Sequence, residues 1–231
     1  MDRPRSGFAA GWRRQQLVWL STPAWQDVLA GAQLRSVLDD DLDCLAYWAA
    51  HELPLVVTRQ EPDLPGWIAL GLPAPAHWQR RRLALLVPVD AIERVGEFPA
   101  ASAITPLLSA GVRSDWAALC QALAGPGRCA RVGGSHGWQV LTGLPCLHPG
   151  SDIDLLLSVA DAGCADAVAR TLDQAPHGLP RLDGELIFDD GAAVAWREWL
   201  AWRQGRIGSL LVKRLDSVAL EDGLALGGLP A

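Results

Sequence analysis

The sequence predicts an α+β protein of two subdomains, and three observations support this fold class. The chain has 231 residues, half of them hydrophobic, which is enough to bury a sizeable core. Its first hundred residues alternate short apolar runs with Pro and Gly, whereas the later residues alternate strand-like and helix-like patterns. A softer segment, residues 95–111, separates the two halves. We therefore predict an N-terminal α+β domain over residues 12–108 and a C-terminal domain, a mixed sheet flanked by helices, over residues 109–231.

The first half contains four apolar runs that predict short strands because Pro or Gly interrupts the chain between them. These runs are LVWL, LPLVV, WIALGL and LALLVPV. One helix is predicted among them, over residues 41–53, where Leu42, Leu45 and Ala49 recur at helical spacing. The acidic residues 39–41 favour its N-terminus through the helix dipole.

The second half predicts the order helix, strand, loop, strand, helix, strand. Ser114 is the predicted N-cap of a helix that ends at the GPG of residues 125–127. Strands are predicted at 129–132, 152–159 and 181–188. Asp161 is the predicted cap of the helix between the last two strands, whose apolar stripe includes Ala165, Val168 and Leu172.

Composition narrows the class of protein. The formal charge of −6 disfavours binding to extended nucleic acid, because the net field repels phosphodiester polymers. The five cysteines show no CxxC spacing, which argues against a disulfide framework or a zinc cluster. No apolar run is long enough for a signal-peptide core or a membrane span. We therefore expect a cytoplasmic protein without a membrane partner.

Two aspartates at the head of a predicted strand are the first candidate for chemistry. Alternation along the strand places Asp152 and Asp154 on one face and Ile153 and Leu155 on the other. Two like charges at this distance repel unless a cation lies between them, and carboxylates together with substrate phosphates are typical ligands of Mg²⁺. The alternative interpretation is an acidic turn in which one aspartate caps the strand entrance.

Sixteen residues separate a Gly-Ser turn from these aspartates. Gly133 and Gly134 let the backbone approach a ligand closely, and Ser135 adds a hydroxyl and an N–H group suited to phosphate oxygens. Alone, this stretch also fits a plain turn between a strand and a helix. The next strand carries Asp183 and Glu185 on one face, and a third carboxylate would complete a site for two metal ions.

This combination resembles the nucleotidyltransferase superfamily typified by DNA polymerase beta, although the sixteen-residue gap is longer than is common there. A narrower resemblance rests on GGSHGWQVLTGLPCLHPGSDIDLLL, ALGLPAPAHWQRRRLALLVP and RLDGELIFDDGAAVAWREWL. These stretches look like those of the phosphoribosyl-dephospho-CoA transferases, the holo-acyl-carrier-protein synthases of malonate decarboxylase. The similarity covers most of the chain beyond its first dozen residues.

The resemblance implies a nucleotidyltransferase-like C-terminal domain and a specific reaction. The implied donor is 2'-(5''-triphosphoribosyl)-3'-dephospho-CoA, the acceptor is a serine of the apo acyl-carrier subunit of malonate decarboxylase, and pyrophosphate leaves. The catalytic, metal-binding pair of the family falls on Asp152 and Asp154. For the third carboxylate, the pattern of the superfamily fits Asp183 best, with Glu185 as the alternative.

Several other residues are candidates for binding. Gly134, Ser135 and Lys213 are predicted to contact the substrate phosphates, and Mg²⁺ is the predicted cofactor. Residues 80–82 form the only basic run, which is either a solvated strand entrance or a docking patch for an acidic carrier protein. His136 and His148 flank the loop between the Gly-Ser turn and the aspartates, without a partner at a telling spacing.

Two other functions stay open at this point. One is a nucleotidyltransferase that moves a simple nucleotide from an NTP to a small molecule or a protein. The other is a non-catalytic binding module in which the acidic strands are only structural.

Overall fold

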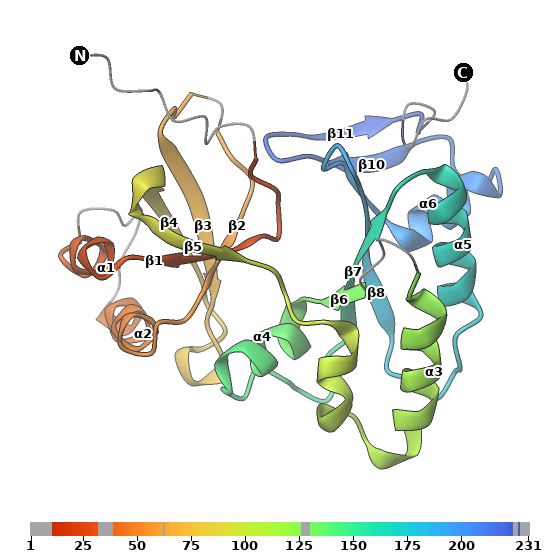
Figure 1. The fold of residues 1–231 in the computed structure, drawn as a ribbon, viewed down its shortest axis with the longest axis horizontal. Coiled ribbons are helices and arrows are strands. Elements are labelled where there is room, and N and C mark those ends of the chain that lie inside the picture. Colours follow the sequence, from red (N-terminus) through yellow and green to blue (C-terminus); the bar gives the residue numbers. More distant parts are fainter. Residues whose placement is uncertain (1–10, 32–38, 62, 126–129, 224–225, 227–231) are drawn as a thin grey trace. The chain divides into compact units, whose positions relative to one another are not determined.

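The computed structural model describes residues 11–31, 39–61, 63–125, 130–223 and 226, and Figure 1 shows their arrangement. The chain divides into two compact units, Met1–Glu97 and Phe98–Ala231, each with its own sheet. The fold is therefore α+β, as the sequence predicts.

The first unit is built on a five-stranded sheet in the order β4-β3-β2-β1-β5, in which every paired strand is antiparallel. Helices α1 and α2 pack side by side next to this sheet (Figure 1). The Ser21 hydroxyl caps α1 by accepting a hydrogen bond from the N–H of Ala24. The elements are β1 (Leu17–Leu20), α1 (Thr22–Leu29), α2 (Asp39–Ala50), β2 (Leu55–Val57), β3 (Trp67–Pro73), η2 (Ala76–Trp78), β4 (Arg82–Pro88), η3 (Val89–Ala91) and β5 (Ile92–Gly96).

The second unit is built on a six-stranded mixed sheet in the order β11-β10-β9-β8-β7-β6. Strands β7 and β8 run parallel and are joined by α5, while the other pairs are antiparallel. The elements are η4 (Ala101–Leu107), η5 (Ala110–Val112), α3 (Arg113–Leu123), β6 (Ala130–Val132), α4 (Gly134–Thr142), β7 (Ile153–Val159), α5 (Ala162–Asp173), β8 (Leu182–Phe188), β9 (Ala193–Ala195), α6 (Trp196–Arg203), β10 (Leu210–Lys213) and β11 (Val218–Glu221).

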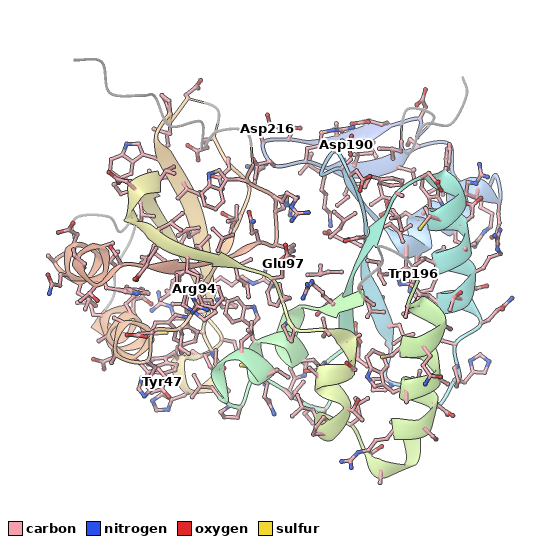
Figure 2. All side chains as sticks on the ribbon, viewed as in Figure 1. Tyr47, Arg94, Glu97, Asp190, Trp196 and Asp216 are labelled. Carbon is pink, nitrogen blue, oxygen red and sulfur yellow. The ribbon has the colours of Figure 1, made fainter. Side chains whose placement is uncertain are left out.

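The two faces of β7 differ in burial. Ile153, Leu155 and Leu157 are buried in the core of this unit, together with the apolar stripes of α3 and α5 and the first residues of α6. Trp196, labelled in Figure 2, is fully buried in the same core. Asp154 and Leu156, on the opposite face, are only partly buried. Helices α3, α5 and α6 therefore cover one face of the sheet, and the other face carries the partly buried acidic residues of β7 and β8.

The predicted strands and helices of both halves are present, and Asp161 caps α5 through its bond from the Cys164 N–H. Strand β5 and the helical turns of 101–107 were not predicted, and the composition of residues 95–111 indicated a linker or domain edge. Ala101, Ile104 and Leu108 pack in the core of the second unit, so the chain divides after Glu97 rather than after residue 108. The prediction for Ser114 was wrong: α3 begins at Arg113, and its N-cap is Val112.

Candidate active site

The acidic residues of the second unit meet because β7 and β8 run parallel. The register pairs Asp154 with Asp183 and Leu156 with Glu185. Paired residues of neighbouring strands point to the same side of a sheet, so the carboxylates of Asp154, Asp183 and Glu185 share the face opposite α3, α5 and α6. Asp152 lies two residues before Asp154, directly before β7, and so is at the edge of this face.

Asp154 is the residue on which these charges converge. Burial raises the pKa of its carboxyl group, and the negative charges of Asp183, Asp152 and Glu185 raise it further. The other three acidic residues singled out in the sequence therefore all act on Asp154. A cation at this position would offset the cost of burying a charged carboxylate and would reduce the repulsion between the neighbouring carboxylates.

The Gly-Ser turn lies against the same carboxylate. The N–H of Gly133 donates to the carbonyl of Asp154 at 2.9 Å, which extends the β6–β7 ladder by one rung. The next residue, Gly134, begins α4 with a φ of 52°, and a Cβ on it would lie 1.7 Å from Oδ2 of Asp154. Glycine is thus required both for the left-handed backbone and for the space that the Asp154 side chain occupies.

Two cations contact the acidic face. Lys213, on β10, reaches across β9 and donates from Nζ to Oε1 of Glu185 at 2.6 Å. Arg181 lies 3.7 Å from Oδ2 of Asp152 and is largely exposed. In the part of the chain that the structure describes, no cationic side chain lies within ion-pair distance of Asp154 or Asp183. The neighbour of Lys213, Arg214, is instead paired with Glu221.

The chemistry of this donor set fits a hard divalent cation. Its side-chain donors are carboxylate oxygens, and their mutual repulsion at Asp154 is the condition that such a cation removes. Among the described residues, no three His, Cys, Asp or Glu side chains already enclose a metal position. This is compatible with Mg²⁺, which is held by one or two carboxylates and completes its shell with phosphate oxygens and water.

Other candidates lie elsewhere or have structural partners. His148 is exposed, and its Nδ1 accepts a hydrogen bond from the N–H of Gly150. Within the basic run, which belongs to the first unit, Arg81 forms an ion pair of 2.8 Å with the buried Asp41. Arg80 and Arg82 are exposed.

One residue that the sequence analysis left without a role belongs to the site. His136, in the first turn of α4, is buried, and its Nδ1 lies 3.1 Å from the backbone oxygen of Asp152. Burial lowers the pKa of this imidazole, and the bond to Asp152 opposes that effect. The only available signal was its position directly after Ser135, which alone could not reveal a partner sixteen residues away.

Within the described residues, no helix has the length and apolar character that a membrane crossing requires.

Comparisons with known proteins agree over both units. Residues 13–98 match the family described as phosphoribosyl-dephospho-CoA transferase MdcG N-terminal domain, and residues 100–223 match the corresponding C-terminal domain. A phosphoribosyl-dephospho-CoA transferase of Xanthomonas campestris pv. campestris (strain 8004) is 36% identical over 220 residues, covering 92% of this chain and 95% of the relative. One from Bradyrhizobium diazoefficiens is 35% identical over 223 residues, covering 90% and 89%.

No solved structure matches the chain. The two family matches and the full-length relatives are nevertheless sufficient: the chain belongs to the phosphoribosyl-dephospho-CoA transferase family, a family of transferases.

Proposed function

We propose that this protein transfers the phosphoribosyl-dephospho-CoA group from 2'-(5''-triphosphoribosyl)-3'-dephospho-CoA to a serine of the apo acyl-carrier subunit of malonate decarboxylase, with release of pyrophosphate. Membership of the family supports the identity of the transferred group. The observation that carries the chemistry is the pairing of Asp154 with Asp183 beside the Gly134 turn. This arrangement gathers negative charge where a triphosphate and its metal ions can bind.

Mg²⁺ is the proposed cofactor, and Asp152, Asp154 and Asp183 are its proposed ligands. When bound, it would supply positive charge for the triphosphate and lower the pKa of the attacking hydroxyl. Glu185, kept as the alternative third carboxylate by the sequence, already contacts Lys213 at 2.6 Å. The ion pair favours Asp183, whose carboxylate accepts only a hydrogen bond from the N–H of Gly184 among the described residues.

The side chains on this face would orient the reactants. Among the described residues no side chain caps α4, so its first turn would offer the Ser135 hydroxyl and backbone N–H groups to phosphate oxygens, and Lys213 would add a positive charge on the same face. In the reaction, a bond forms between Oγ of the acceptor serine and the α-phosphorus. The bond from that phosphorus to the pyrophosphate oxygen breaks, and the hydroxyl proton is released.

Carrier recognition is proposed to involve the first unit. Arg80 and Arg82 are exposed and can attract an acidic carrier surface. Arg81 is less suited to this role, because its guanidinium is engaged with Asp41. The docking patch is therefore narrower than the run of three arginines suggests.

Intact-protein mass spectrometry of the apo-carrier tests the proposed function. The purified protein is incubated with Mg²⁺ and either the full donor or ATP. A site shaped for the long donor uses remote binding energy to orient the reacting phosphorus, so the full prosthetic group should be attached far faster than AMP.

An AMP-sized mass increase as the dominant product would favour a general nucleotidyltransferase. No mass increase with either donor, on a verified apo-carrier, would favour a binding module. Loss of the product when EDTA replaces Mg²⁺ is expected, and full activity in EDTA would contradict the metal assignment.

A further inference from the structure

His136 is a buried polar residue that the proposed chemistry leaves without a task. Its side chain is 4% exposed, and among the described residues only Asp41 is a comparably buried polar or charged residue. A buried imidazole loses its hydrogen bonds to water, so it is tolerated when a partner inside the protein replaces them. The partner here is the backbone oxygen of Asp152, 3.1 Å from Nδ1.

The direction of this bond is fixed by its partner. A carbonyl oxygen can only accept, so Nδ1 of His136 must carry the proton and donate it. The bond crosses from the first turn of α4 to the residue directly before β7. It therefore links the helix that carries the Gly-Ser turn to the first of the two aspartates.

The bond replaces a rung of the sheet that the backbone cannot supply. Strand β6 pairs with β7 as far as Val132, and the N–H of Gly133 then reaches the carbonyl of Asp154. At Gly134 the chain turns into α4, with a φ of 52°, and its backbone leaves the sheet. Carbonyls two residues apart point to the same edge of a strand, so the carbonyl of Asp152 faces this side and receives the His136 side chain instead.

The consequence concerns the Asp152 carboxylate. Asp152 follows a long loop and lies outside β7, so only its contacts hold its backbone extended. The bond from His136 holds the Asp152 carbonyl at the edge of β7, and an extended backbone there would place the Asp152 carboxylate on the same face as that of Asp154. Loss of the rung would free the first aspartate while leaving the second in its strand.

We propose that His136 is a positioning residue: its imidazole holds the Asp152 carbonyl and thereby aligns the Asp152 carboxylate with that of Asp154. This assignment rests on the proposed function. Partners that orient metal ligands typically change metal affinity or activity by about 10- to 100-fold when they are removed, so the effect should be large enough to measure.

Three substitutions of His136 distinguish the effect of losing its hydrogen-bond donor from the effect of losing the volume of its ring. His136→Asn keeps an N–H donor near the place of Nδ1, His136→Gln moves the amide outward to the place of Nε2, and His136→Leu removes the donor. Each full-length variant is assayed for transfer from the full donor to the apo-carrier over a range of Mg²⁺ concentrations. Mn²⁺ affinity, followed by electron paramagnetic resonance, provides a readout independent of activity.

The Asn variant should stay close to the wild type, whereas the Leu and Gln variants should lose kcat by about 10- to 100-fold and bind Mn²⁺ more weakly, with an unchanged KM for the carrier. Thermal unfolding checks that each variant is folded, and His177→Asn, at an exposed histidine of the same unit, is the control. If the Leu variant does not fold, the comparison of Asn with Gln decides.

Equal kcat and equal Mn²⁺ affinity in the Asn and Gln variants, or in the wild type and a folded Leu variant, would overturn the assignment. Absence of transfer by the wild type would instead overturn the proposed function. The Mn²⁺ affinities of the three variants would then still test whether His136 aligns Asp152.

Discussion

The two units differ in the charges that surround a buried or partly buried carboxylate. In the first unit, the buried Asp41 forms an ion pair of 2.8 Å with Arg81. In the second, burial and the negative charges of Asp183, Asp152 and Glu185 raise the pKa of the Asp154 carboxyl. An ion pair needs nothing from outside the protein, whereas a group of like charges gains stability when a cation binds. The contrast separates an acid with a partner inside the protein from one that we propose binds a metal ion.

The register of the second sheet explains how this acidic group forms. Every strand pair in the first sheet is antiparallel, whereas β7 and β8 of the second are parallel. The parallel register sets Asp154 beside Asp183 although they are far apart in the sequence. Helices α3, α5 and α6 pack on the other face, so the charges collect on the face that lacks these three helices.

The largest effect is expected from Asp154→Asn, which removes the central charge without changing the volume of the side chain. Transfer to the apo-carrier should fall by more than about 100-fold, because even outer partners of metal ligands cost 10- to 100-fold. Asp41→Asn should not reduce turnover of folded protein comparably, if the two acids differ as described. Near-native turnover of the Asp154 variant with Mg²⁺ would remove this residue from the active site.

The second prediction concerns the two acids of β8. Asp183→Asn should reduce kcat by about 10- to 100-fold or more, and Glu185→Gln should cost less, because Glu185 is held by Lys213. Steady-state rates at saturating Mg²⁺ compare the two variants directly. The reverse order would make Glu185 the third carboxylate and would leave the ion pair as a state that metal binding breaks.

The sequence alone predicted that Asp152 and Asp154 lie on one face, because side chains alternate between the two faces of a strand. It also predicted the buried stripe of α5 and the cap at Asp161. It could not choose between Asp183 and Glu185, since the choice depends on Lys213, which arrives from β10.

Contacts between distant segments account for the other gaps. The bond from His136 to Asp152 and the pair between Arg81 and Asp41 exist only because separate elements come together. Neither has a local signature in the sequence. The small residues and Pro106 of residues 101–107 indicated a linker or domain edge, yet Ala101 and Ile104 pack in the core of the second unit.

Of the five cysteines, Cys129 lies outside the described residues.

The basic run of the first unit allows a matched comparison. Arg81→Ala should lower the free energy of unfolding by about 1–3 kcal/mol, less than for a fully buried pair because Arg81 is partly exposed. Arg80→Ala with Arg82→Ala should leave stability nearly unchanged and raise the KM for the carrier at low salt. Denaturant unfolding and carrier titrations measure the two effects. An unchanged KM would exclude the two exposed arginines from docking.

The smallest expected effect is that of the Asp154 charge on the free energy of unfolding. The pKa of Asp154 is raised in the folded state, whereas an unfolded carboxyl titrates at about pH 4. Between these two pKa values the folded protein binds more protons than the unfolded one, so the free energy of unfolding falls as pH rises. Above the raised pKa, the whole destabilisation by the charged Asp154 is present. In EDTA at neutral pH, Asp154→Asn should unfold at a higher temperature than the wild type, and this difference should shrink on acidification. A difference that does not depend on pH would contradict the repulsion at Asp154.

We propose that the carboxylates of β7 and β8 hold the catalytic metal, and anomalous diffraction from crystals of the protein soaked with Mn²⁺ and the full donor can show whether they do. We expect a Mn²⁺ peak bound by Asp152, Asp154 or Asp183, with the triphosphate beside Gly134 and Ser135. Bound donor without any metal peak at these carboxylates, at saturating Mn²⁺, would contradict it.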